Sequence, residues 1–376
     1  MALRAVVVGA GLIGACVSAR LAQRGAEVTL LDAGFPGEGT TGSSFAWVDA
    51  SHPSLRPYVE LNVDGLDAWR RFGAALGDPS WLTLTGTLTW EREPAAAATL
   101  ERHIETLAQL GCDAQRLTRA QVLALEPDLT PGADVAQTVL FPAEGYVFTR
   151  PALADVLALG RDAGLRVRPG ARVAGFRERG DALRGVTLAT GEEIDADLVV
   201  TCAGRWTGEL LGAVDVEIPM IAPEGAGSAA VGLLVTTTPV ITRLQRVIHA
   251  DGLMIRPDGA GRLLLHGDAQ DTRVRHDEAT SPPPAPALEL VEHLRGLLRG
   301  TETARIETAR IGIRALPADR SPVVGRVREG LYVVVTHSGI TLAPLLGELV
   351  GEELIGERPS TALERFRPAR FERAAA

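Results

Sequence analysis

Three glycines and one aspartate near the N-terminus have the residue types and the spacing to bind a pyrophosphate and a ribose. Gly9, Gly11 and Gly14 form a GxGxxG pattern, and Asp32 follows eighteen residues after Gly14. In such a pattern the first glycine makes a tight turn, the second lets the backbone approach a pyrophosphate, and the third lets a helix pack closely against a strand. The pyrophosphate then meets the free N–H groups at the helix N-terminus. Asp32 can accept hydrogen bonds from ribose hydroxyls.

The elements expected around this pattern decide how much weight it carries. Residues 3–8 form an apolar, β-branched run of strand length, residues 13–21 place apolar side chains at helical spacing, and residues 27–31 predict a second strand ending at Asp32. A GxGxxG pattern between a strand and a helix, with the acid at this distance, indicates a bound adenine dinucleotide. The aspartate disfavours a 2′-phosphate, so NADP is the least favoured of these ligands.

The rest of the chain bears on whether the dinucleotide is NAD or FAD. A loop rich in glycine, serine and threonine occupies residues 37–44, where another β–α unit would otherwise follow. Strand-like runs at residues 197–201 and 331–335 lead into the glycine-containing turns at residues 202–206 and 337–341. Because these junctions lie far apart in the sequence, the nucleotide-binding domain is expected to be discontinuous.

These features together resemble the FAD-dependent amino acid and amine oxidoreductases, the family that includes D-amino acid oxidase, glycine oxidase and sarcosine oxidase. The resemblance covers nearly the whole chain and, beyond the N-terminal fingerprint, rests on four segments in the family's order. They are Gly145-Tyr146-Val147 with Pro151, Ala171-Arg172-Val173, Ala203-Gly204-Arg205-Trp206, and a C-terminal signature from Gly312-Ile313-Arg314 through residues 319–325 to residues 338–344.

The resemblance implies an α/β fold class with two domains. A discontinuous, Rossmann-like FAD-binding domain would comprise residues 1–80, 145–215 and 310–376. A second, β-rich α+β substrate-binding domain would comprise residues 81–144 and 216–309. Several strand-like runs between Ile218 and His266 agree with the β-rich character of the second domain.

The resemblance also implies which residues hold FAD. Three segments would do so: the glycine fingerprint, the loop at residues 40–44, and the turn at residues 338–341. Backbone N–H groups of that turn would face the pyrimidine end of the flavin, where negative charge grows on reduction. Val173 would contact the adenine. The expected cofactor contacts are Gly9, Gly11, Leu12, Ile13, Gly14, Asp32, Ala33, Thr40, Thr41, Ser43, Ser44, Val173, Ala203, Gly204, Trp206, Ser338, Gly339, Ile340 and Thr341.

Arg314 is the residue expected to bind the substrate, because it matches the position that clamps a substrate carboxylate in glycine oxidase. A guanidinium pairs bidentately with a carboxylate, which suits that role. The alternative is a structural ion pair, since the chain contains 38 basic residues and all of them are arginine. His337 could lie beside the flavin or could simply be a polar residue that ends a strand.

The expected reaction is the oxidation of the C–N bond of a small amino acid or N-substituted amino acid. FAD accepts a hydride from the carbon that bears the nitrogen, and water hydrolyses the resulting imine. Two alternatives stay open from the residues: a flavin-dependent hydroxy-acid oxidoreductase, and a non-catalytic flavoprotein subunit of a larger complex. The electron acceptor, O2 or another molecule, stays open as well.

The absence of lysine excludes several kinds of chemistry. A Schiff base with pyridoxal phosphate or a carbonyl substrate cannot form, and a phosphate-loop lysine is missing. The oxygen-activating lysine of the sarcosine oxidases has no counterpart, which leaves oxidase and dehydrogenase activity both possible.

The number and spacing of cysteines and histidines limit which metals and which covalent cofactor links are expected. Cys16, Cys112 and Cys202 are odd in number and widely spaced, so neither a disulfide framework nor a CxxC metal site is expected, and a reducing cytoplasm fits. Sarcosine oxidases attach flavin to a cysteine in the C-terminal third, whereas no cysteine follows Cys202 here, so FAD is expected to be non-covalent. The seven histidines contain no HExxH motif, and no metal is expected.

Overall charge and hydropathy limit the classes of binding partner that the protein is expected to have. The net charge of −9 argues against nucleic acid and anionic membrane as partners, because both require a basic face. The uncharged run at residues 6–19 resembles a short signal peptide, but it is too short to span a membrane and the nucleotide fingerprint explains it better. The partner that the resemblance implies is a small amine or amino acid.

Overall fold

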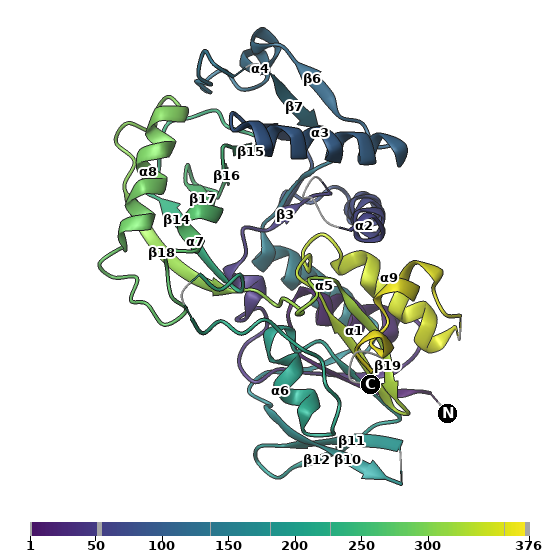
Figure 1. Cartoon of the computed structure of the whole chain (residues 1–376). Helices are drawn as coiled ribbons and strands as arrows, with labels where there is room; N and C mark the ends of the chain where they lie inside the picture. The colour runs from purple at the N-terminus through teal and green to yellow at the C-terminus, as the bar shows by residue number, and fades with distance from the viewer. Residues whose placement is uncertain are drawn as a thin grey trace.

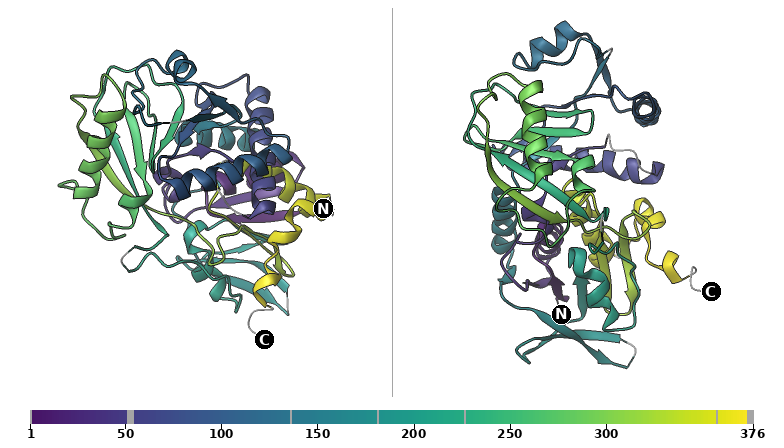
Figure 2. Two further views of the ribbon diagram at one scale, coloured as in Figure 1. Left: turned by 45° about the horizontal axis from the view of Figure 1, so that its top comes forward. Right: turned by 60° about the vertical axis from the view of Figure 1, so that its left-hand side comes forward.

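A computed structural model describes residues 2–50, 55–135, 137–180, 182–225, 227–356 and 358–372. Two large sheets dominate the described chain, one of six strands and one of eight, and two three-stranded sheets lie beside them. Figure 1 and Figure 2 place the three-stranded sheet within residues 173–195 at one end of the molecule, and the eight-stranded sheet lies toward the other end. The α/β fold with a second, β-rich part is thus confirmed.

The six-stranded sheet has the strand order of a Rossmann-like fold. From edge to edge the strands are β19 (Val323–Arg328), β20 (Leu331–Val335), β13 (Leu198–Thr201), β1 (Arg4–Val8), β2 (Glu27–Leu31) and β9 (Arg166–Arg168). All neighbours are parallel except β19, which pairs antiparallel with β20. Val7 lies between Val200 and Leu30, and all three are fully buried, as expected for strands covered on both faces.

Helices cover one face of this sheet and a smaller sheet covers the other. Helix α1 (Leu12–Gln23) connects β1 to β2 and packs against α5 (Thr149–Asp162) and α9 (Ala343–Ile355), while α2 (Arg56–Ala75) packs against α9. Side chains on the opposite face form a second core with the three-stranded sheet of β10 (Val173–Arg179), β11 (Ala182–Leu188) and β12 (Glu193–Asp195). Val173, the residue expected to contact the adenine, is the first residue of β10.

The eight-stranded sheet forms the β-rich part. Its order is β18 (Ile306–Ile313), β14 (Val231–Thr237), β17 (Leu263–Gly267), β16 (Leu253–Pro257), β15 (Val247–Ala250), β5 (Thr87–Trp90), β7 (Thr138–Phe141) and β6 (Gln115–Leu117). One face packs against α8 (Ala285–Leu297) and α4 (Arg119–Leu125). The other face packs against Phe45, Trp47 and Tyr146, which belong to the segments that join the two large sheets.

The remaining elements are short or peripheral. Thr118 caps α4, because its backbone N–H donates to Gln121 Oε1 at 2.8 Å and its hydroxyl accepts the Gln121 N–H. The other elements are η1 (Thr40–Ser43), β3 (Trp47–Val48), β4 (Leu82–Thr83), α3 (Pro94–Gln109), β8 (Gly145–Val147), η2 (Gly204–Trp206), α6 (Thr207–Gly212), α7 (Asp268–Asp271), η3 (Thr361–Phe366) and α10 (Ala369–Glu372).

The two large sheets meet where η1 lies against the end of β18. The Thr40 hydroxyl donates to the Ile313 carbonyl at 2.8 Å. A side chain at Gly312 would bring its Cβ within 2.6 Å of the Ser43 carbonyl oxygen, so this close approach requires glycine. Because β18 spans residues 306–313, it crosses the expected domain limit at residue 310, and the limits themselves stay a prediction.

Candidate cofactor and substrate site

A cavity of about 800 Å³ opens at the carboxyl ends of β1, β2, β13 and β20, where ligands bind in open α/β sheets. Most of the residues expected to contact the cofactor line it, and His337 lines it too. These lining residues are Gly9, Gly11, Leu12, Ile13, Gly14, Asp32, Ala33, Thr40, Thr41, Ser44, Val173, Ala203, Gly204, Trp206, Gly339 and Ile340. Ser43, Ser338, Thr341 and Arg314 are not among the lining residues.

The glycine turn has the geometry that a dinucleotide requires. Gly9 has φ +103°, a backbone conformation that favours glycine. A Cβ on Gly14 would lie 1.9 Å from the Gly9 carbonyl oxygen, so this position tolerates no side chain. A Cβ on Gly11 would lie 3.1 Å from Thr41 Oγ1 and would reduce the space at the N-terminus of α1. Asp32 accepts the Ala10 N–H and Thr41 Oγ1 accepts the Leu12 N–H at 3.0 Å, so a pyrophosphate would meet the other N–H groups of this turn.

The Asp32 carboxylate connects this turn to the next strand. Its Oδ2 accepts the Ala10 N–H at 2.7 Å and its Oδ1 accepts the Gly34 N–H at 2.9 Å. A carboxylate has about four acceptor positions, and these two contacts use half of them. Asp32 also lines the cavity, so the remaining lone pairs are available to ribose hydroxyls.

The turn at residues 336–341 is held by helix α2, a support that the sequence did not reveal. The Tyr58 Oη accepts the Ser338 N–H at 3.0 Å and lies 2.8 Å from Ser338 Oγ and 2.9 Å from Thr336 Oγ1. Eleven residues further along the same helix, Trp69 Nε1 donates to the Ile340 carbonyl at 2.9 Å. Burial raises the pKa of Tyr58, so its hydroxyl stays protonated and can donate. The Ser338 hydroxyl is thus hydrogen-bonded to Tyr58, in agreement with its absence from the residues that line the cavity.

We expect Tyr58→Phe to lower the affinity of the protein for FAD several-fold, up to about tenfold, because two hydroxyls and one N–H in the turn lose their partner. Titration of apo-protein with FAD measures the dissociation constant. Tyr332→Phe is the matched control, since the buried Tyr332 hydroxyl donates to Glu353. Both variants should unfold at lower temperature, and equal FAD affinities in the two would contradict a specific role for Tyr58.

Ser43 and Thr341 also bond to protein groups. The Ser43 hydroxyl donates to the Gly39 carbonyl at 3.2 Å. Thr341 is 1% exposed, and its Oγ1 accepts the Asp49 N–H at 3.2 Å. The expected role of these two side chains at the cofactor stays a prediction. In the structure, their hydrogen bonds to backbone groups stabilise the conformation of the neighbouring segments.

Arg314 follows β18 and its guanidinium lies over the backbone of β14. A Cβ on Gly232 would lie 3.3 Å from Arg314 Cζ, so the absence of a side chain there makes room for the guanidinium. Nη1 donates to the carbonyls of Ala229, at 3.1 Å, and of Val231. Nη2 donates to Asp271 Oδ2 and lies 3.3 Å from His266 Nε2.

Along part of β14, the side chains of Arg314, Asp271 and His266 supply the hydrogen-bond partners that a neighbouring strand would otherwise provide. Strand β17 pairs with β14 only at residues 234–236. Further along β14, the Leu233 N–H donates to Asp271 Oδ1 at 2.7 Å, and the Leu233 carbonyl lies 3.0 Å from His266 Nδ1. With the two carbonyls that Arg314 binds, the polar backbone groups in this stretch obtain partners.

His266 is buried beside two carboxylates. Burial by itself lowers the pKa of His266, but the hydrogen bond to Asp268 and the charge of Asp271 outweigh burial and raise the pKa above its ordinary value. Ligand atoms of His266, Asp268 and Asp271 lie within 4.8 Å of one another, which is the composition of a metal site. The cation that the structure places at this cluster is the guanidinium of Arg314.

The buried thiols are poor nucleophiles. Burial raises the pKa of Cys16 to about 12, and burial also raises the pKa of Cys202, which lines the cavity. A thiol with a raised pKa holds little thiolate near neutral pH. This agrees with a cofactor bound without a covalent bond to these residues.

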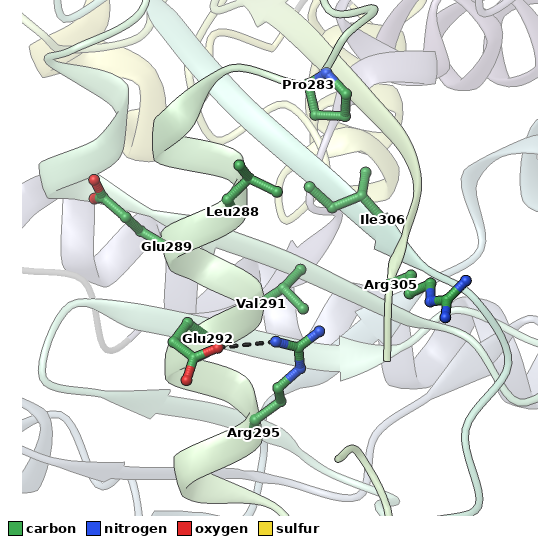
Figure 3. Close-up of a pocket in the computed structure, with 8 residues that line it drawn as sticks. All are labelled: Pro283, Leu288, Glu289, Val291, Glu292, Arg295, Arg305 and Ile306. Atoms are coloured by element: carbon green, nitrogen blue, oxygen red, sulfur yellow. Dashed lines mark hydrogen bonds and ion pairs between the residues drawn. The ribbon is translucent and has the colours of Figure 1, made fainter. Parts of the chain in front are cut away.

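A second hollow, of about 510 Å³, lies between α8 and the edge strand β18 (Figure 3). Leu288, Val291 and Ile306 line it, and the Arg295 guanidinium pairs with Glu292 at 2.9 Å. Glu289, another lining residue, pairs with Arg273, and the walls carry none of the predicted site residues. The large cavity is the candidate site.

Within the described residues, every helix is either too short or too polar to cross a bilayer.

Comparisons with known proteins agree with the geometry of the cavity. Residues 4–353 match the family model DAO, described as FAD dependent oxidoreductase. Glycine oxidase of Geobacillus kaustophilus (strain HTA426) is 27% identical over 369 residues, which cover 95% of this chain and 94% of that protein. D-amino acid dehydrogenase of Methylobacterium sp. (strain 4-46) is 26% identical over 453 residues, covering 99% of this chain and 100% of that protein.

Solved structures show the same fold. L-proline dehydrogenase from P. horikoshii superimposes with a TM-score of 0.85 at 20% identity, covering 99% of this chain and 98% of that chain. The family match spans most of the chain, and the cavity carries the dinucleotide turn, the acidic residue after β2, and a turn before α9 in the order that the sequence predicts. The chain therefore belongs to the DAO family of FAD-dependent oxidoreductases.

Proposed function

We propose that this enzyme oxidises the C–N bond of a small amino acid or N-substituted amino acid. The observation that carries the proposal is a dinucleotide cavity, in a chain of an FAD-dependent family, that is lined by Ala315, the residue that follows Arg314. Glycine oxidase, D-amino acid dehydrogenase and L-proline dehydrogenase are among the proteins similar to this chain, and the names of all three refer to amino acids. The three names differ in substrate, so only the substrate class is proposed.

The residues present fit FAD. Bound FAD would supply the ring that accepts a hydride. The N-terminus of α1 would hold the pyrophosphate, Asp32 the ribose and Val173 the adenine. In the turn at residues 338–341, Tyr58 accepts the Ser338 N–H and the His337 carbonyl accepts the Gly339 N–H, so the N–H that would face the flavin pyrimidine is that of Ile340, which lines the cavity. We also propose the division into an FAD-binding and a substrate-binding domain at the limits expected from the sequence.

Arg314 is the residue that we propose for the substrate carboxylate, and His337 for a position beside the flavin. The next residue after Arg314, Ala315, lines the cavity, and so does the exposed His337. Binding the carboxylate would fix the direction in which the substrate C–H points. Such orientation contributes much of the rate in enzymes whose cofactor performs the bond-breaking step.

The test is anaerobic mixing of the purified protein with a panel of amino acids, N-methyl amino acids and hydroxy acids. The oxidised flavin band near about 450 nm should bleach with one or more amines. Bleaching by hydroxy acids alone would contradict C–N oxidation, and no bleaching by any compound would favour a non-catalytic flavoprotein. Reoxidation in air-saturated buffer then distinguishes O2 from another acceptor. We propose the cytoplasm as the location.

We expect denaturation to release the flavin as free FAD. The described cysteines near the cavity are buried thiols with raised pKa values, and no cysteine follows Cys202. Acid precipitation followed by chromatography of the supernatant measures the released cofactor. Flavin remaining in the protein pellet would contradict non-covalent binding.

A further inference from the structure

One face of the eight-stranded sheet carries two histidines in a single row of paired residues. His249 of β15 lies opposite Met254 of β16, and Met254 lies opposite His266 of β17. Residues that lie directly opposite on neighbouring strands point to the same face. The His249 ring contacts Trp47 edge-on, with centroids 5.6 Å apart, and the His266 ring lies 6.2 Å from that of Phe45. Both histidines therefore face the segment that continues from the wall of the cofactor cavity.

Charged side chains lie at both ends of this row. Glu91 follows β5, and its Oε1 lies 4.0 Å from His249 Nε2. At the other end, Arg314 Nη2 lies 3.3 Å from His266 Nε2. His266 Nε2 donates its proton to Asp268, whose Oδ1 lies at 3.5 Å, so it cannot accept from Arg314. The Arg314 N–H on this side thus remains available for the carboxylate of the proposed substrate.

Glu91 is surrounded by negative charge. Within the described ranges of the chain it forms no ion pair with an arginine, whereas the neighbouring Asp251 pairs with Arg92 at 2.8 Å. The Glu91 side chain is 15% exposed, and burial together with the charges of Asp251, Asp268 and Glu93 raises its pKa to about 7. A cation placed beside Glu91 would be attracted by several carboxylates and would favour the ionised form of Glu91.

A buried hydroxyl beside Glu91 also lacks a partner. Thr89 lies two residues before Glu91 and directly opposite His249, on the same face of the sheet. Thr89 is 3% exposed, and its Oγ1 forms no hydrogen bond with any residue that the structure describes. Leaving a buried hydroxyl without a partner is unfavourable. A ligand that brings N–H groups to Glu91 would supply a donor here.

The separation of the two ends suits an amino acid with a long side chain. One strand lies between β15 and β17, and neighbouring strands are about 4.8 Å apart, so the columns of His249 and His266 are about 10 Å apart. With a hydrogen bond at each end, an extended lysine or arginine molecule bridges a distance of this order between its carboxylate and its terminal nitrogen. Glycine or alanine bound at Arg314 would leave Glu91 without a contact.

We propose that Glu91 determines substrate specificity by binding the terminal ammonium or guanidinium group of a basic amino acid whose carboxylate is bound by Arg314. The proposal rests on the proposed function, since it names the side chain of that enzyme's amino acid substrate. Glu91 accepts a charge-assisted hydrogen bond from the cationic group, and Asp268 adds to the attraction. The site thereby favours a cationic side chain over an uncharged one of the same length.

The experiment compares the binding of ε-aminocaproate and caproate to the holoenzyme. These probes share the carboxylate and the chain length, and only the first carries a terminal ammonium group. The shift of the flavin visible spectrum, or calorimetry, gives the dissociation constants. The wild type should bind ε-aminocaproate at least about tenfold more tightly than caproate, and Glu91→Gln should reduce this preference to about threefold or less. The remaining preference reflects Asp268, whose side chain is 59% exposed and therefore more strongly screened.

Glu93→Gln is the matched control. Glu93 is exposed and lies two residues from Glu91, and its Oε2 accepts the Ala96 N–H at the start of α3, a contact that an amide oxygen can also make. This variant should keep the wild-type preference for ε-aminocaproate within about threefold. Glu91→Gln should fold as well, because the raised pKa of Glu91 shows that its surroundings accommodate the uncharged form.

Equal affinities of the wild type for the two probes would overturn the proposal, and so would a preference that Glu91→Gln retains in full. Should Glu91→Gln fail to fold, the wild type alone decides: a clear preference for ε-aminocaproate supports the proposal and equal affinities overturn it. In the bleaching panel, lysine or arginine should reduce the flavin at lower concentrations than norleucine. The binding readouts require no flavin reduction, so failure of the proposed function appears separately, as absence of bleaching with every amine.

Discussion

Arg314→Ala should lower the rate of flavin reduction by about a hundredfold while FAD stays bound, because misplacement of a substrate by about 1 Å can cost that much. The variant should also be less stable. Its Asp271 would be a nearly buried carboxylate without its cation, and removing one partner of a buried pair typically costs about 3–5 kcal/mol. Anaerobic stopped-flow reduction and denaturant unfolding measure the two effects independently.

Companion variants separate catalysis from stability. Arg314→Lys should recover part of the rate, since an ammonium supplies the charge but lacks the two parallel donors. The double variant Arg314→Ala with Asp271→Asn should recover much of the stability, because no unpaired buried charge remains, and none of the substrate orientation. If Arg314→Ala reduced its flavin as fast and at the same half-saturation as the wild type, Arg314 would be a purely structural residue.

The second large effect concerns the cofactor. Asp32→Ala should raise the dissociation constant for FAD about ten- to a hundredfold, the amount that one charge-assisted hydrogen bond contributes. The structure adds a second reason, since the variant also removes the acceptor of the Ala10 and Gly34 N–H groups and loosens the glycine turn. Titration of apo-protein with FAD measures the constant.

Asp32→Asn is the informative comparison. The amide retains one oxygen acceptor in nearly the same shape, so its FAD affinity should lie between those of the wild type and the alanine variant. Unfolding of the apo-proteins shows how much of each effect is loss of the turn itself. Retention of FAD by Asp32→Ala at wild-type affinity would contradict the assignment of Asp32 to the ribose.

The sequence alone determined the features that depend on local spacing. Apolar periodicity and glycine position located β1, α1 and β2, and the strand-like runs at residues 197–201 and 331–335 located β13 and β20. The roles of Gly9 and Gly14 could be predicted for the same reason. Gly9 has a positive φ, and a Cβ on Gly14 would lie 1.9 Å from the Gly9 carbonyl oxygen, so both constraints come from backbone nearby in the sequence. Such local constraints act within one or two turns of chain, and a sequence pattern displays them directly.

Only the tertiary structure decided which side chains become partners across the fold. Tyr58 and Ser338 are 280 residues apart, and Arg314 and Asp271 are 43 apart, yet each pair is hydrogen bonded. The register of β14 and β18, which pairs Val231 with Ile313, places Arg314 beyond the paired strand ends. Strand β17 pairs with β14 only at residues 234–236, and the unpaired backbone of β14 needs donors that Arg314 and His266 supply. The spacing of residues in the sequence does not reveal this requirement, because it arises only when strands of unequal length pair. The same requirement brings the Arg314 guanidinium to the backbone of β14, where it pairs with Asp271.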